Sequence, residues 1–217
     1  MVIEGLDGSG KSYTARHTAQ DLSELYPRAR IGMADSTGLY DYRAGQLVSH
    51  KYPKLECIEP VVGEGRLKTV ARLGAFTLTR KLIDYQGLRR SDLLISVRDP
   101  QRVDPATYST VYHPGIFGRM SAASRLEFFD RFTNAEYPDA IVDLIVSPER
   151  AAMLTAERVA TSPHETIDSL EKLSIELPAV LHAYTEAYGV PVLEVEGGLK
   201  DTVAAATDTA ERLLASV

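Results

Sequence analysis

The sequence has little cysteine and no tryptophan. Among its 217 residues Cys57 is the single cysteine, which excludes an internal disulfide and any zinc site built from several cysteines. It shows neither a signal-peptide pattern nor an apolar run of 18 residues, so we expect no secretion and no membrane partner. A chain with one reduced thiol and none of these segments is expected to be cytoplasmic.

An excess of positive charge is also missing. The net charge is −6 and the isoelectric point is about 5.4, so the chain lacks the excess of basic residues that is typical of nucleic-acid-binding proteins. No nucleic-acid partner is expected. The hydrophobic fraction of 44% is sufficient for a substantial core. With 217 residues, a single α/β domain spanning 1–217 is the expected organisation.

A glycine-rich stretch near the N-terminus reads Gly-Leu-Asp-Gly-Ser-Gly-Lys-Ser from Gly5 to Ser12. It follows a short apolar run and precedes a helical pattern over 11–25, so strand, turn and helix occur in the order that a phosphate-binding loop requires. In such a loop backbone N–H groups and the helix N-terminus face phosphate oxygens. The alternative is a flexible Gly/Ser turn with a solvated lysine.

The motif assigns chemical roles to its last two residues. Lys11 can reach the β- and γ-phosphates of ATP, and the Ser12 hydroxyl can ligate Mg²⁺. ATP and Mg²⁺ are therefore the expected cofactors. The residues expected to bind the nucleotide are Gly5, Asp7, Gly8, Ser9, Gly10, Lys11, Ser12 and Tyr13.

Along the rest of the chain, strand patterns alternate with helical ones, which predicts a parallel sheet between layers of helices. We expect a three-layer fold of the P-loop NTPase type with five parallel strands. The predicted strands are 1–3, 30–34, 93–97, 140–146 and 190–195, and the predicted helices are 11–25, 42–50, 65–87, 124–135, a helix from 148, 165–188 and 202–215. The proline-rich run 101–118 is predicted to be a loop, and a polar break predicts a short mobile lid around 150–165.

Two further features carry candidate site residues. Phe76 and Arg80 lie one helical turn apart in the 65–87 pattern, so both could face one binding site. The alternative without a binding role is a core phenylalanine and a solvated arginine. Asp99 follows the apolar strand 93–97, which suits a carboxylate that holds Mg²⁺. The alternative for Asp99 is a turn or helix-capping residue.

Residues 3–12, Ile-Glu-Gly-Leu-Asp-Gly-Ser-Gly-Lys-Ser, resemble the opening of thymidylate kinases, which are P-loop nucleoside monophosphate kinases. The resemblance implies that Asp7 faces the acceptor sugar, that Phe76 stacks on its base and that Arg80 meets a base carbonyl. Asp99 and Tyr108 match the aspartate and the tyrosine nine residues later in the family's Asp-Arg-Tyr segment. The resemblance also implies a lid arginine at Arg158, a homodimer, and an acceptor that is dTMP or a related pyrimidine nucleotide.

The chain departs from that family where the acceptor phosphate is bound. Pro100 replaces the arginine that normally grips this phosphate, Leu154 replaces a lid arginine, and the loop after the second strand lacks the family's motif. The arginines that could compensate are Arg98, Arg102, Arg66 and Arg72, and we assign Arg98 to the acceptor site with Tyr108. The sequence thus predicts an ATP-dependent nucleoside monophosphate kinase, with a nucleoside or other small-molecule kinase, or a nucleotide-binding accessory protein, as alternatives.

Overall fold

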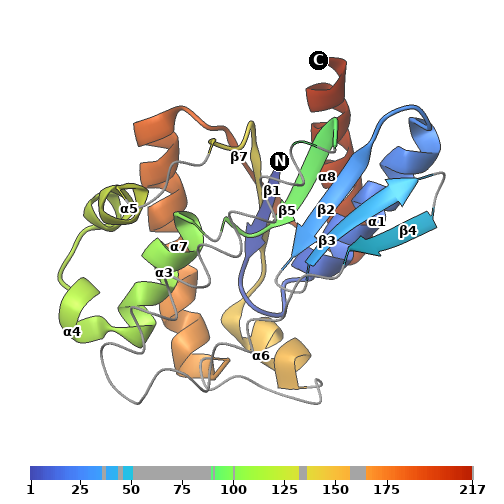
Figure 1. The fold of residues 1–217 in the computed structure, drawn as a ribbon. Helices are drawn as coiled ribbons and strands as arrows, with labels where there is room; N and C mark the ends of the chain where they lie inside the picture. The colour runs from blue at the N-terminus through green and yellow to red at the C-terminus, as the bar shows by residue number, and fades with distance from the viewer. Residues whose placement is uncertain are drawn as a thin grey trace.

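The computed structural model describes residues 1–35, 38–43, 46–50, 89, 91–99, 101–131, 136–156 and 165–216. Its strands form one sheet in the order β4-β3-β2-β5-β1-β6-β7 (Figure 1). The strands are β1 Val2–Gly5, β2 Ile31–Asp35, β3 Gly38–Arg43, β4 Gln46–His50, β5 Leu93–Val97, β6 Ile141–Ile145 and β7 Val192–Glu196. The helices are α1 Lys11–Leu25, α3 Val103–Tyr112, α4 Pro114–Phe117, α5 Ala122–Asp130, α6 Pro148–Ala156, α7 Ile167–Tyr188 and α8 Leu199–Ala215.

The central part of the sheet confirms the predicted α/β fold. β2, β5, β1, β6 and β7 are mutually parallel, as expected for strands joined through helices. The prediction of a helix over 42–50 was wrong, because these residues belong to an antiparallel hairpin, β3 and β4, that extends the sheet beyond β2. The hairpin covers the backbone edge that β2 would otherwise expose, and Leu39 and Tyr42 are buried with it.

The prediction of a loop over 101–118 was also wrong. α3 and α4 occupy most of it, because both prolines that suggested a loop lie where helices tolerate them. Pro105 is the third residue of α3 and Pro114 the first of α4, positions whose N–H would lack an intrahelical acceptor anyway. Pro178 lies in the interior of α7, which nevertheless runs on to Tyr188. The predicted helix 65–87 lies outside the described residues.

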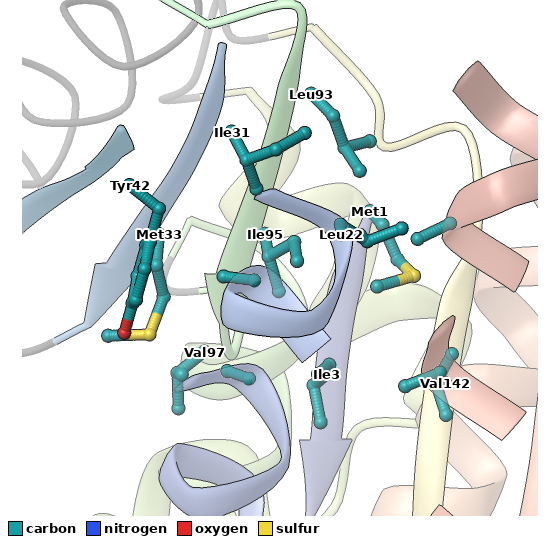
Figure 2. Close-up of a cluster of buried hydrophobic side chains, with 14 of the residues drawn as sticks. Met1, Ile3, Leu22, Ile31, Met33, Tyr42, Leu93, Ile95, Val97 and Val142 are labelled. Carbon is teal, nitrogen blue, oxygen red and sulfur yellow. The ribbon is translucent and has the colours of Figure 1, made fainter. Parts of the chain in front are cut away.

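Helices cover both faces of the sheet (Figure 1). On one face, α1 and α8 pack on alternate residues of the strands, including Ile3, Ile95 and Val142. Figure 2 shows Leu22 of α1 among these side chains. On the other face, α3, α5 and α7 pack on Val2 and Ile141. No helix in the described part of the chain is long and apolar enough to cross a membrane.

This topology brings three loops together at one edge of the sheet. The strands β5, β1 and β6 are parallel neighbours, so the segments that follow their carboxyl ends lie side by side. The loop after β1 is the glycine-rich motif, and it lies between the segment after β5 and the segment after β6. The motif therefore has one flank on the β5 side and another on the β6 and β7 side.

Candidate active site

The glycine-rich motif is a tight loop between β1 and α1. Gly5, Gly8 and Gly10 all have positive φ, at 137°, 89° and 91°. A Cβ atom on Gly8 would lie 2.6 Å from the carbonyl oxygen of Ala151, in α6, so a larger residue would push α6 off the loop. The loop thus depends on glycine for close packing as well as for its positive φ values.

The loop offers hydrogen-bond donors that suit a phosphate group. The Ser9 hydroxyl is buried and has no hydrogen-bond partner within the described structure. The first N–H groups of α1 have no acceptors within the helix, and the helix dipole is positive at this end. A phosphate oxygen can accept from a buried, unpaired hydroxyl and from N–H groups that have no acceptor within the helix, so the loop fits the nucleotide phosphates predicted for it.

Lys11 is the first residue of α1 and is only 7% exposed. Its ammonium donates to the carbonyl oxygens of Gly5 and Leu6, at 2.8 and 2.5 Å, so it lies folded over the loop. Burial lowers the Lys11 pKa to about 7, and the charge of Arg98 adds to this effect. A bound phosphate would restore the charged form, because an anion beside a buried ammonium raises its pKa.

A cavity of about 220 Å³ opens on the β6 and β7 side of the loop. The loop itself, the end of β6, the start of α6 and the turn into α8 enclose it. Its lining residues are Gly8, Ser9, Gly10, Tyr13, Leu144, Ile145, Val146, Arg150, Leu154, Gly197, Gly198, Leu199 and Thr202. Tyr13, assigned to the nucleotide from sequence, thus lies at this cavity, where its ring stacks on His17 with centroids 3.8 Å apart.

A charged cluster occupies the opposite flank, after β5. The Arg98 guanidinium forms ion pairs with Asp7 of the loop and with Asp104 of α3, the latter at 2.9 Å. The Tyr108 hydroxyl donates to the other oxygen of Asp7 at 3.0 Å, and the guanidinium lies 4.8 Å from the Tyr108 ring centroid. Three residues predicted for the acceptor site, Asp7, Arg98 and Tyr108, are therefore in contact, and Asp104 joins them.

Arg98 adopts an unusual backbone conformation to take part in this cluster. Its φ is 69°, and it is the one non-glycine residue with positive φ in the described ranges. Its N–H donates to the carbonyl oxygen of Ile3 at 2.9 Å, and the N–H of the next residue, Asp99, donates to the Glu4 carboxyl group. Hydrogen bonds to β1 thus fix the backbone at Arg98 and at the residue that follows it. Strain of this kind persists where surrounding contacts require it, and here it directs the side chain toward the P-loop.

Asp99 has contacts of a different kind. One carboxylate oxygen accepts from the N–H groups of Gln101 and Arg102, at 3.0 and 3.2 Å, in the turn that leads into α3. The other accepts from the Tyr184 hydroxyl at 3.3 Å. These are the contacts of the turn-forming alternative, and the role of Asp99 as a metal ligand stays a prediction.

The predicted Mg²⁺ ligand Ser12 lies exposed in the first turn of α1, open to a metal held by nucleotide phosphates. Within the described residues, no group of three or more His, Cys, Asp or Glu side chains could hold a metal ion on its own. Three other predicted residues, Phe76, Arg80 and Arg158, lie outside the described residues, and so does most of the predicted lid beyond α6.

Glu4 was not assigned a role from the sequence, although a glutamate inside an apolar strand is an unusual signal. It is 2% exposed, and its carboxylate accepts from the N–H of Asp99. Burial raises the Glu4 pKa to about 8, and the negative charge of Asp104 adds to the effect. A carboxyl group that holds its proton near neutral pH thus lies beneath the P-loop.

The raised pKa of Glu4 predicts a pH dependence of stability. Between about pH 4.5 and pH 8 folded Glu4 keeps a proton that the unfolded chain has released, so rising pH favours unfolding. Lys11 acts in the opposite direction only above about pH 7, where the folded lysine has lost its proton and the unfolded one has not. Between pH 5 and pH 7 the Glu4→Gln variant should therefore lose less melting temperature than the wild type.

Melting curves of both proteins at pH 5 and pH 7 measure this difference. Asp143, a second buried carboxyl whose pKa burial raises to about 6, titrates equally in both proteins and cancels in the comparison. Equal losses of melting temperature in the two proteins would contradict a protonated Glu4 in the folded state.

Comparison with known proteins agrees with the fold described above. No family model and no curated protein sequence matches the chain. Among solved structures, a deoxyadenosine kinase from M. mycoides with bound dATP matches with a TM-score of 0.61 and 15% sequence identity, over 97% of this chain and 98% of that chain. The chain thus has an α/β fold of the P-loop kinase kind, with a mostly parallel sheet flanked by helices.

Proposed function

We propose that the protein is an ATP-dependent phosphotransferase whose acceptor is a nucleoside. ATP would place its phosphates in the P-loop, and its base and ribose would extend into the cavity beside Tyr13 and Arg150. The acceptor would lie on the other flank, against the cluster of Asp7, Arg98 and Tyr108. The two ligands would then meet above Lys11, which is the geometry that phosphoryl transfer requires.

The charge of the acceptor flank supports a nucleoside, and not a nucleotide, as the acceptor. Arg98 is bonded to two carboxylates, Asp7 and Asp104, so this cluster has one positive and two negative charges. Arg102 is 2% exposed, pairs with Asp130 at 2.5 Å and lies 4.2 Å from the Tyr137 ring centroid, turned toward α5. The other proposed substitutes, Arg66 and Arg72, lie outside the described residues. Among the described residues of this cluster, an acceptor phosphate would therefore meet net negative charge, whereas an uncharged nucleoside would not.

Each residue of the site has a distinct part in this proposal. Lys11 would stabilise the charge that develops on the transferring phosphoryl group, and the P-loop N–H groups would hold it in place. Asp7, fixed by Arg98 and Tyr108, would accept a hydrogen bond from a hydroxyl of the acceptor sugar. Ser12 would ligate Mg²⁺, which when bound neutralises phosphate charge.

The second candidate is transfer to a nucleoside monophosphate. It is favoured by the sequence of the loop, because Asp7 and its neighbours resemble the thymidylate kinases more than a general P-loop. The fold is compatible with both candidates, and a homodimer, implied by the same resemblance, stays a prediction. A nucleotide-binding accessory protein remains the alternative without transfer.

A panel of acceptors tests the proposal. ADP formation from ATP and Mg²⁺ would be measured with thymidine, deoxycytidine, deoxyadenosine and their 5′-monophosphates, with Lys11→Ala as the inactive control. We expect kcat/KM for the best nucleoside to exceed that for its monophosphate by at least about fivefold, since like charges at close range cost about 1 kcal/mol or more. The reverse order would support the monophosphate kinase. If none of the tested acceptors stimulated ADP formation, both candidates would be refuted.

A further inference from the structure

Asp99 forms hydrogen bonds with four parts of the fold, namely β1, the turn before α3, α3 itself and α7. Its N–H donates to Glu4 of β1, and its carbonyl oxygen accepts from the N–H of Asp104 in α3 at 2.9 Å. Its carboxylate accepts from the two N–H groups of the turn before α3 and from the hydroxyl of Tyr184 in α7. Asp99 thus links the start of α3 to β1, to the turn before α3 and to α7.

Tyr184 supplies the contact from α7. It is 0% exposed, and its ring packs among the apolar side chains between α3, α5 and α7. A phenylalanine would fill the same space, so packing does not explain the hydroxyl, which must find a partner when it is buried. That partner is Asp99, and burial beside this carboxylate raises the pKa of Tyr184, which keeps the hydroxyl as a donor.

The acceptor flank depends on where α3 begins. Asp104 lies in the first turn of α3 and Tyr108 one turn later, and both contact the Arg98 and Asp7 pair. A small shift of the first turn would carry both side chains away from Asp7. Misplacement by about 1 Å in a reacting geometry can lower a rate by about 100-fold, so the start of α3 matters to transfer.

We propose that Tyr184 is a positioning residue for phosphoryl transfer: through Asp99 it fixes α3 so that Tyr108, Asp104 and Arg98 hold Asp7 toward the acceptor. This inference rests on the proposed function and adds to it a residue of α7 that touches neither ligand. Loss of the Tyr184 hydroxyl should therefore affect the acceptor and not ATP. The reason is that α3 borders the acceptor flank, whereas the cavity on the β6 and β7 side has no lining residue from α3.

The first test compares two substitutions that each remove one hydroxyl from the same helix. Tyr184→Phe should lower kcat/KM for the acceptor by about tenfold and change the KM for ATP by less than about twofold, the effect expected from losing one hydrogen bond to a charged group. Tyr188→Phe is the control. Its ring centroid is 4.8 Å from that of Tyr184, but its hydroxyl interacts with Asp130 instead of Asp99. Acceptor kinetics of Tyr188→Phe should stay within about twofold of the wild type.

A double-mutant cycle then asks whether Tyr184 acts through Asp99. In an Asp99→Ala background the Tyr184→Phe change should have no further effect on acceptor kcat/KM, because the shared contact is already lost. Independent, multiplying effects of the two changes would overturn the inference. So would equal losses toward ATP and acceptor in Tyr184→Phe, or an equal loss in Tyr188→Phe.

Amide hydrogen exchange separates this inference from the proposed function. If the wild type transfers phosphate to no acceptor, the proposed function fails, but the positioning of α3 can still be measured. The amides of Gln101 and Arg102, which donate to Asp99, should exchange at least about tenfold faster in Tyr184→Phe than in Tyr188→Phe. Equal exchange in the two variants would show that Tyr184 does not fix this turn.

Discussion

Replacement of Lys11 by alanine is expected to lower the rate of phosphoryl transfer by about 10²–10³ while the protein stays folded. Loss of one preorganised donor to developing charge typically has this effect on rate. Stability should change little, because burial opposes the charged form of Lys11, as its lowered pKa indicates, and its partners are loop carbonyl oxygens. Initial rates of ADP formation and a melting curve on the same preparation measure both quantities.

Lys172→Ala, at an exposed position of α7, is the matched control for this variant. It removes the same side chain away from the loop and should leave the rate unchanged. A Lys11→Ala protein that retains more than about a tenth of wild-type turnover would contradict the assignment of the P-loop as the transfer site.

The second large effect is expected at Arg98. Its guanidinium pairs with two carboxylates, and the side chains of Arg98, Asp7 and Asp104 are 20%, 16% and 17% exposed. Arg98→Ala would leave both carboxylates largely buried without their cation, at a cost of about 3 kcal/mol, or about 6–12 °C in melting temperature. Because Asp7 would also lose its position, acceptor kcat/KM should fall by about 100-fold.

A double variant separates the two consequences of this change. Arg98→Ala combined with Asp104→Ala removes one of the stranded carboxylates and should recover part of the melting temperature. It should not recover acceptor kcat/KM, because Asp7 still lacks its ion pair. Full activity in either variant would mean that Asp7 needs no support from Arg98, and wild-type melting of Arg98→Ala would mean that the ion pairs contribute nothing to stability.

Local patterns in the sequence were sufficient for most of the fold. The strand, glycine-rich turn and helix at the N-terminus were predicted correctly, because glycine positions and hydrophobic periodicity act within a few residues of each other. The errors fell at 42–50 and 101–118, where tertiary context decided. The hairpin at 38–50 is stabilised by pairing with β2, and α3 by packing on α5 and α7, neither of which is visible in a local pattern.

The same distinction separates the residues of the site. The P-loop was predictable because its chemistry lies in eight consecutive positions, with Lys11 and Ser12 at a fixed spacing from the glycines. The acceptor flank was predictable only as a set of candidates. Asp7 and Arg98 are 91 residues apart, and their ion pair exists because β1 and β5 are neighbours in the sheet.

Sequence by itself thus determined the class of fold and the phosphate-binding loop, because backbone geometry and helix dipoles are set by adjacent residues. The tertiary structure decided that Arg98 faces the loop, since it turns toward Asp7 through a left-handed backbone that β1 holds in place. It also decided that Asp99 meets a turn and a tyrosine of α7. Contacts between residues far apart in the chain depend on how strands and helices pack, and no local pattern encodes them.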